Sequence, residues 1–97
     1  MKTIRTTSAY DNFESTLKDL AIRARIQARI QRLAQGNAGD HRHLKKGVSE
    51  LRVDAGPGYR VYYTERNHET LVILLVGGDK SSQQRDISLA YELVDLL

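Results

Sequence analysis

Three stretches of the sequence carry side chains that could handle a phosphate group. They are the basic run His41-Arg42-His43-Leu44-Lys45-Lys46-Gly47, a strand-like region with Glu50, Arg52, Arg60 and Tyr62, and the segment Gly77-Gly78-Asp79-Lys80. Lysine and arginine neutralise phosphates, and tyrosine stacks on nucleic-acid bases. Because antiparallel pairing brings distant parts of a chain together at strand ends, we expect these groups to converge in one pocket.

Such a set could cleave RNA without a metal ion. A general base would take the proton of the 2′-hydroxyl group, a general acid would protonate the leaving oxygen, and cations would stabilise the extra charge on phosphorus. Histidine is the residue type suited to proton transfer near neutral pH, and arginine grips phosphate oxygens with a planar fork of donors. We predict catalytic roles for Arg60, His43, Lys45, Lys46, Asp79 and Lys80, and RNA-binding roles for Arg42, Arg52, Tyr62 and His41.

Each assignment has a structural alternative. The two histidines and the lysine pair could be solvated surface residues, Arg60 could pair across strands with Glu50, and Asp79 could cap the last helix. The motif His41-x-His43 lacks a convincing third and fourth ligand for a metal ion. We therefore expect neither a metal nor another cofactor.

The first forty residues predict a short strand and two helices. Lys2–Thr6 is the strand, and Ser8 has the character of a helix N-cap. Two apolar stripes follow at helical spacing: Tyr10, Phe13, Leu17 and Leu20, then Ile22, Ile26, Ile30 and Leu33. Asp19 could cap the second helix, which Gly36 would end, although one bent helix also fits. On the opposite side of the second helix we expect solvated arginines, namely Arg25, Arg29 and Arg32.

After residue 40 the sequence changes to a period of two, which predicts an antiparallel meander of three strands. Its turns are Gly56-Pro57-Gly58 and Asn67-His68. Leu71–Val76 is continuously apolar, as is typical of a central strand buried on both faces, and Gly77-Gly78 would end it. Ser81 with Gln84 then resembles a capping box for a last helix, whose leucines make it apolar on more than one side.

The order of these elements predicts one α+β domain that spans residues 1–97. We expect a short N-terminal strand, two helices, the three-stranded meander and a C-terminal helix packed on one face of the sheet. In this prediction the helices cover one face and the charged side chains occupy the other.

Composition excludes several classes of protein. Hydrophobic residues make up 40% and charged residues 28% of the chain, which is ordinary for a globular domain. The absence of cysteine removes disulfide scaffolds and thiolate chemistry, and favours a cytoplasmic location. No apolar run approaches the roughly 18 residues of a membrane span, so we expect no membrane contact. Residues 1–48 hold ten lysines and arginines against four acidic residues, which favours a polyanionic partner.

Two motifs make the sequence resemble a known family. They are Gly56-Pro57-Gly58-Tyr59-Arg60-Val61-Tyr62-Tyr63 and Gly77-Gly78-Asp79-Lys80-Ser81-Ser82-Gln83. With them the chain, from about Phe13 to Ala90, resembles the addiction-module killer proteins, the phage Gp49-like or HigB-like branch of the RelE/ParE toxin superfamily. The resemblance implies a RelE/ParE-like fold and a toxin of a type II toxin–antitoxin system. It further implies a ribosome-dependent mRNA endoribonuclease that inhibits translation.

The same resemblance implies partners and site positions. The partners are a cognate helix-turn-helix antitoxin of the HigA type, the ribosome and mRNA, with operator DNA bound only through the antitoxin. Arg60 falls on the family's strand arginine, His43 and the lysine pair Lys45-Lys46 fall in its basic loop, and Asp79-Lys80 stand where several relatives carry His, Tyr or Arg. Two other functions remain open: a ParE-like inhibitor of DNA gyrase, and a co-repressor that binds the antitoxin without catalysis.

Overall fold

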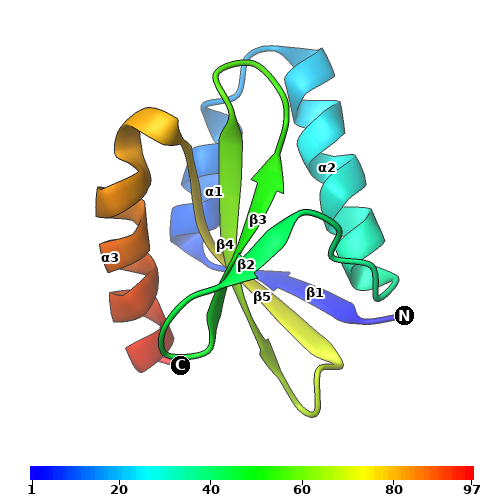
Figure 1. Cartoon of the computed structure of the whole chain (residues 1–97), viewed down its shortest axis with the longest axis vertical. Coiled ribbons are helices and arrows are strands. Elements are labelled where there is room, and N and C mark those ends of the chain that lie inside the picture. The colour runs from blue at the N-terminus through cyan, green and yellow to red at the C-terminus, as the bar shows by residue number, and fades with distance from the viewer.

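The computed structural model describes residues 1–97 and contains a five-stranded sheet with helices on both faces (Figure 1). The strand order is β1-β5-β4-β3-β2, and all neighbours are antiparallel except β1, which runs parallel to β5. The strands are β1 (Thr3–Thr6), β2 (His41–His43), β3 (Val48–Val53), β4 (Tyr59–Arg66) and β5 (Leu71–Asp79). The helices are α1 (Ser8–Ser15), α2 (Leu20–Ala34) and α3 (Gln83–Asp95), with a short 3₁₀ turn, η1 (Lys80–Ser82). The predicted α+β class and the meander β3-β4-β5 are confirmed.

The helices lie on opposite faces of the sheet, so the prediction that all of them cover one face is wrong. Helices α1 and α2 cover the larger core of twelve buried residues, and α3 covers a smaller core of six. The second face is apolar at its centre because Tyr62 of β4 and Leu75 of β5 point to it, where Ala90 and Val94 of α3 pack. Charged side chains are therefore confined to the part of this face that α3 leaves uncovered.

The helix starts differ from prediction in one place and agree in another. Thr7, not Ser8, caps α1: its hydroxyl accepts a hydrogen bond from the backbone N–H of Tyr10 at 3.1 Å and donates to the carbonyl of Leu75 at 2.5 Å. The second bond ties the start of α1 to β5. Asp19 caps α2 through the N–H groups of residues 21 and 22, so α1 and α2 are separate helices. Leu20 is 75% exposed because α1 ends at Ser15 and Leu20 begins α2 instead of extending the first apolar stripe.

Two segments predicted as loops or strand ends belong to the sheet. His41–His43 forms the edge strand β2 and pairs with β3. Gly77-Gly78 does not end β5, which continues to Asp79. A side chain at Gly77 would overlap the ring of Phe13, and one at Gly78 would overlap the carboxylate of Asp86. The glycines therefore let one helix approach the strand on each face.

The C-terminal helix begins without the predicted capping box. Asp79 accepts hydrogen bonds from the backbone and the hydroxyl of Ser81 and so caps η1, while α3 starts after Ser82 with no side-chain cap. Leu96 and Leu97 at its end are exposed. None of the helices combines the length and the apolar character needed to cross a membrane.

Candidate functional site

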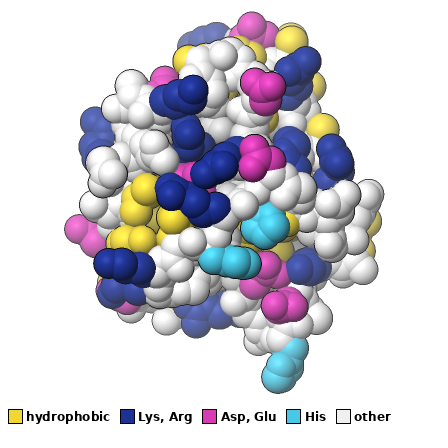
Figure 2. All heavy atoms as spheres, in the orientation of Figure 1, with side chains coloured by type: hydrophobic (Ala, Val, Ile, Leu, Met, Phe, Trp, Pro, Cys, Tyr) yellow, Lys and Arg dark blue, Asp and Glu magenta, His cyan; other side chains and the backbone are white.

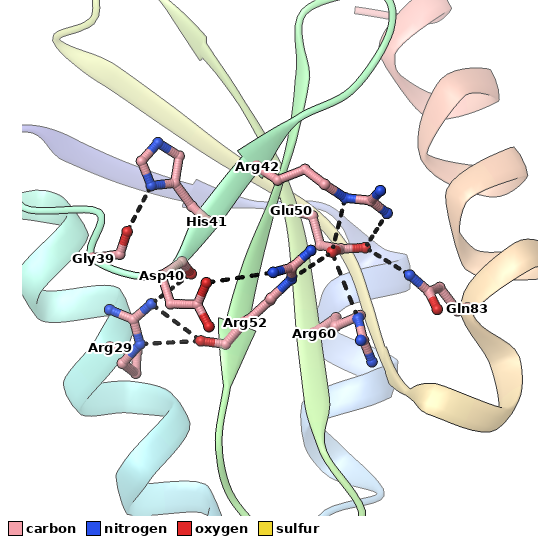
Figure 3. Close-up of polar contacts among 9 residues, drawn as sticks. All are labelled: Arg29, Gly39, Asp40, His41, Arg42, Glu50, Arg52, Arg60 and Gln83. Atoms are coloured by element: carbon pink, nitrogen blue, oxygen red, sulfur yellow. Dashed lines mark hydrogen bonds and ion pairs between the residues drawn. The ribbon is translucent and has the colours of Figure 1, made fainter.

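A buried carboxylate organises the charged part of the sheet. Glu50 of β3 has no exposed surface, and its oxygens face three arginines from three neighbouring strands (Figure 3). The register explains this meeting, because Arg42 of β2 lies directly opposite Glu50, and Arg60 of β4 lies directly opposite Arg52 of β3. Side chains two residues apart on a strand share a face, so all four groups point to the side that α3 partly covers.

Both carboxylate oxygens of Glu50 have close partners. Its Oε1 lies 3.2 Å from Nε of Arg52, 3.3 Å from Nε of Arg42 and 3.6 Å from Nε of Arg60. Its Oε2 accepts a hydrogen bond from the side-chain amide of Gln83 at 3.2 Å. Gln83 is the first residue of α3, so this bond also joins the helix to the arginine cluster.

The charge state of Glu50 follows from these contacts. Burial alone would raise the pKa of the Glu50 carboxyl, but hydrogen bonds from Arg42, Arg52 and Gln83 hold that pKa below its usual range. The carboxylate is therefore ionised at neutral pH, and it neutralises only one of three guanidinium groups. The cluster of Arg42, Glu50, Arg52 and Arg60 keeps a net positive charge.

Arg60 is the most enclosed of the three cations. Its side chain is 14% exposed, against 45% for Arg42 and 41% for Arg52. Its Nε atom is buried and has no hydrogen-bond partner, since Glu50 is too distant for a good bond. The guanidinium is thus held beside Glu50 by charge and by packing.

A cavity of about 360 Å³ opens beside this cluster at the end of the β3–β4 hairpin. Arg52, Arg60 and Lys80 supply its cations, and Asp40 and Asp54 supply carboxylates. The turn Gly56-Pro57-Gly58 forms part of its wall. Figure 2 shows lysine and arginine side chains gathered at the centre of this face of the molecule. Lys80 and Arg60 thus line the same cavity, because Lys80 follows the end of β5 and Arg60 lies opposite Gly78 of that strand.

Tyr62 lies beneath the cluster instead of at the surface. It is fully buried in the smaller core, and its hydroxyl has no hydrogen-bond partner. Burial raises the pKa of the Tyr62 phenol far above its ordinary value, and the neighbouring Glu50 and Asp86 carboxylates add to this rise. A ring in this position cannot stack on a base, so the structure does not place Tyr62 where the predicted RNA contact would need it.

The histidines are held away from Glu50. His41 and His43 alternate with Arg42 along β2, so their rings turn to the other face, where they contact each other at a centroid distance of 5.3 Å. The Nδ1 atom of His41 lies 2.8 Å from the carbonyl of Gly39, and that of His43 lies 2.9 Å from the hydroxyl of Ser49. Neither histidine lines the cavity.

The lysine pair is also separate from the cavity. Lys46 forms an ion pair of 2.8 Å with Asp95 near the end of α3, and the backbone N–H of Lys45 bonds to the Tyr91 hydroxyl. Both lysines precede β3, whereas Arg60 pairs near its far end. The expected single pocket thus gathers Arg52, Arg60 and Lys80 but not the lysine pair.

Asp79 is used locally, but it caps η1 and not the last helix, α3, which was the structural alternative. Its carboxylate lies 2.8 Å from the N–H of Ser81 and 2.5 Å from its hydroxyl. These hydrogen bonds lower the pKa of Asp79. The Asp79 carboxylate thus caps η1, and this cap fixes the backbone that places Lys80 at the cavity.

Sequence reasoning assigned no role to Arg29 and Gln83, and gave Glu50 only a pairing with Arg60. Arg29, predicted to be solvated, donates to the carbonyls of Asp40 and Arg52 at 2.9 and 3.1 Å (Figure 3). A polar residue at the first turn of the last helix and a glutamate between two strand arginines are weak signals, because only the register shows that they meet. No group of three or more acidic or histidine side chains is placed to hold a metal ion.

Comparison with known proteins places the sequence in a family. The model of the phage-derived protein Gp49-like family (DUF891) matches residues 15–95. A protein of Haemophilus influenzae, described as an uncharacterized protein, is 52% identical over 87 residues, which cover 90% of this chain and 87% of that protein.

Solved structures with the same fold include three that are described as toxins or toxin complexes. The Escherichia coli toxin RelE, as a double arginine-to-alanine mutant in the free state, aligns with a TM-score of 0.65 at 13% identity, covering 96% of this chain and 93% of that one. A metal-bound toxin from Helicobacter pylori aligns with a TM-score of 0.64 at 22% identity, covering 84% and 98%. The RelBE2 toxin–antitoxin complex of Mycobacterium tuberculosis aligns with a TM-score of 0.55 at 18% identity, covering 81% and 98%. The chain therefore belongs to the phage-derived Gp49-like family and has the α+β fold of the RelE-type toxins.

Proposed function

We propose that the protein is the toxin of a type II toxin–antitoxin system and cleaves mRNA on the ribosome without a metal cofactor, thereby inhibiting translation. The observation that carries this proposal is the cavity lined by Arg52, Arg60 and Lys80, with Arg52 and Arg60 anchored on buried Glu50. Its support from comparison is the family and the fold shared with RelE-type toxins.

The cavity suits stabilisation of a phosphate that gains negative charge. Cations fixed before the reaction need no reorganisation when the five-coordinate phosphorus forms, and this effect is often the largest part of enzymatic catalysis. Arg60 contributes most in this scheme, because it lines the cavity and is the least exposed of the three arginines around Glu50. Arg52 and Lys80 would bind the neighbouring phosphate oxygens.

Proton transfer has fewer candidates than charge stabilisation. Since both histidines turn away from the cavity, the carboxylates of Asp40 and Asp54 are its acceptors for the 2′-hydroxyl proton, and Lys80 is its donor to the leaving oxygen. Asp40 is also 3.6 Å from Arg52, which orients it. The ribosome would supply the alignment of substrate that an open cavity cannot, so RNA alone should be cut slowly.

The proposed protein partner is a helix-turn-helix antitoxin of the HigA type, through which operator DNA would be bound. The support is again the fold: the M. tuberculosis structure is a complex of toxin with antitoxin. The same proposal makes the ribosome and its mRNA the targets of the free protein.

The deciding experiment is toeprinting on translating ribosomes with wild-type protein and Arg60→Ala. We expect wild-type protein to cut mRNA in the ribosomal A site and Arg60→Ala to cut about 100-fold more slowly, the usual effect of losing one such donor. Arg66→Ala is the matched control, since Arg66 is an exposed arginine at the other end of the same strand. It should cut at the wild-type rate.

Two results would overturn the assignment. Equal cleavage rates for wild type and Arg60→Ala, with both proteins shown to be folded by circular dichroism, would show that Arg60 has no role in catalysis. If the protein inhibited DNA supercoiling and did not cut mRNA, it would be a gyrase inhibitor and not a nuclease.

A further inference from the structure

A second groove continues from the cavity along the side of α2. It has a volume of about 300 Å³ and shares four wall residues with the cavity: Asp40, Arg52, Val53 and Asp54. Its remaining wall is one side of α2, with Ala28 and three arginines, Arg25, Arg29 and Arg32. We call these three arginines, together with Arg52, the α2 arginine groove. The two hollows form one continuous surface, with Arg52 at their junction.

The arginines of α2 are arranged in a row. Arg25, Arg29 and Arg32 are four and three residues apart, so they lie on one side of the helix at steps of about 6 and 4.5 Å. Figure 2 shows lysine and arginine side chains extending from the centre of this face over α2. The row therefore presents charge along a line, as a polymer of anions would require.

Two members of the row are oriented by backbone carbonyls in β3 and beside the ends of β2 and β3. Arg25 donates to the carbonyl of Asp54 at 2.7 Å, and Arg29 donates to the carbonyls of Asp40 and Arg52. A guanidinium has five N–H donors, so each keeps donors for a ligand. Arg32 forms no ion pair.

The charge of this row is only partly compensated within the protein. No acidic residue lies on α2. The groove has two carboxylates, Asp40 and Asp54, against four arginines, and Asp40 is shared with Arg52. Burial, followed by the neighbouring charge of Arg32, lowers the pKa of Arg29, and Asp40 offsets this only in part. Like charges crowded in this way are stabilised when an anion binds between them.

We propose that the α2 arginine groove binds the phosphodiester backbone of RNA as an anchoring site beyond the point of cleavage. The inference rests on the proposed function only in taking RNA as the ligand of the adjoining cavity. The groove and the cavity are continuous, so one phosphodiester chain can occupy both, and this favours RNA over an acidic peptide as the ligand. Three guanidinium groups in line also match phosphates, which arginine binds with two parallel hydrogen bonds.

The test measures binding, separately from cleavage, with the double variant Arg25→Gln/Arg32→Gln. Both residues are exposed, and Arg32→Gln alone serves as a second variant if the pair affects folding. The control Arg5→Gln/Arg66→Gln removes the same number of charges from exposed positions on β1 and at the end of β4. The ligands are vacant 70S ribosomes and a 20-nucleotide single-stranded RNA, each at several salt concentrations.

We expect the groove variant to bind at least one of these ligands roughly tenfold more weakly at 100 mM salt, with a salt slope smaller by about 2, since each phosphate contact contributes about 1. A loss confined to vacant ribosomes identifies ribosomal RNA as the source of the phosphates, and a loss with the free strand identifies mRNA. Affinities and slopes equal to those of the control for both ligands would overturn the proposal. That result would not alter the toeprinting test of Arg60.

Discussion

Glu50 is the residue on which the geometry of the cavity depends. A fully buried carboxylate is stable only when paired, and here its partners are Arg42, Arg52 and Arg60 with an amide from Gln83. Removing its charge would leave three guanidinium groups facing one another. Glu50 is thus a positioning residue, because it sets where the cations of the cavity point.

We predict that Glu50→Gln lowers the free energy of unfolding by about 2 kcal/mol at pH 7, since it removes the counter-charge of a buried pair whose arginines are partly solvated. The pKa of Glu50 is lower in the folded protein than in the unfolded chain. Its contribution is therefore fully present above the unfolded pKa, about 4.5, and is lost as pH falls through the folded pKa. Urea unfolding should show this difference in the free energy of unfolding between wild type and Glu50→Gln at pH 7, and a smaller difference at pH 3.

The control for this effect is Glu92→Gln, at an exposed position on α3. It should change the free energy of unfolding by less than about 0.5 kcal/mol at either pH. If the difference in the free energy of unfolding between wild type and Glu50→Gln stayed constant from pH 7 to pH 3, the charge of Glu50 would not contribute to stability.

At the scale of elements, the sequence of β5 reflects the helices that pack on its two faces, α1 and α3. The strand lies between β1 and β4, and the register shift opposite Tyr62 and Tyr63 turns both Leu75 and Val76 toward α3. Gly77 and Gly78 follow, and each leaves room for a side chain from one face. Glycine weakens an isolated strand, so its presence here reflects close packing and not a strand end.

We predict that Gly77→Ala destabilises the protein by about 2 kcal/mol, because the new methyl group overlaps the ring of Phe13. Phe13→Leu should recover part of this loss in the double variant, which urea unfolding of the four proteins in the cycle measures. Additive effects of the two substitutions would contradict a direct clash. So would a Gly77→Ala protein within about 0.5 kcal/mol of wild type.

The elements that sequence could predict are those with a clear period. The alternation around Leu51 and the apolar run Leu71–Val76 located β3 and β5, and Asp19 located the start of α2. The edge strand β2 was missed because His41–His43 is short and wholly exposed, so no hydrophobic alternation marks it. Because β2 was missed, its alternation of histidine and arginine could not be used to place these side chains on opposite faces of the sheet.

At the scale of the whole molecule, topology decides which distant charges meet. Arg60 and Lys80 could be brought together from sequence because β4 and β5 are consecutive antiparallel strands. The lysine pair Lys45-Lys46 could not be excluded in the same way, because the position of α3 was unknown. Once α3 covers the second face, its end binds Lys46 and its start binds Glu50, which separates the two basic regions by the length of the helix.

The two cores also predict an uneven distribution of stability. Helix α3 covers six buried residues, lacks a side-chain N-cap and ends in exposed leucines, whereas α2 is capped by Asp19 and packs on the core of twelve. Elements with few buried contacts open locally at lower free energy than the whole protein unfolds. Native-state hydrogen exchange should therefore show α3 amides exchanging at least tenfold faster than those of α2 and β4. Equal protection of α3 and β4 would mean that the two faces unfold as one unit, and Gln83 would then hold Glu50 for as long as the fold persists.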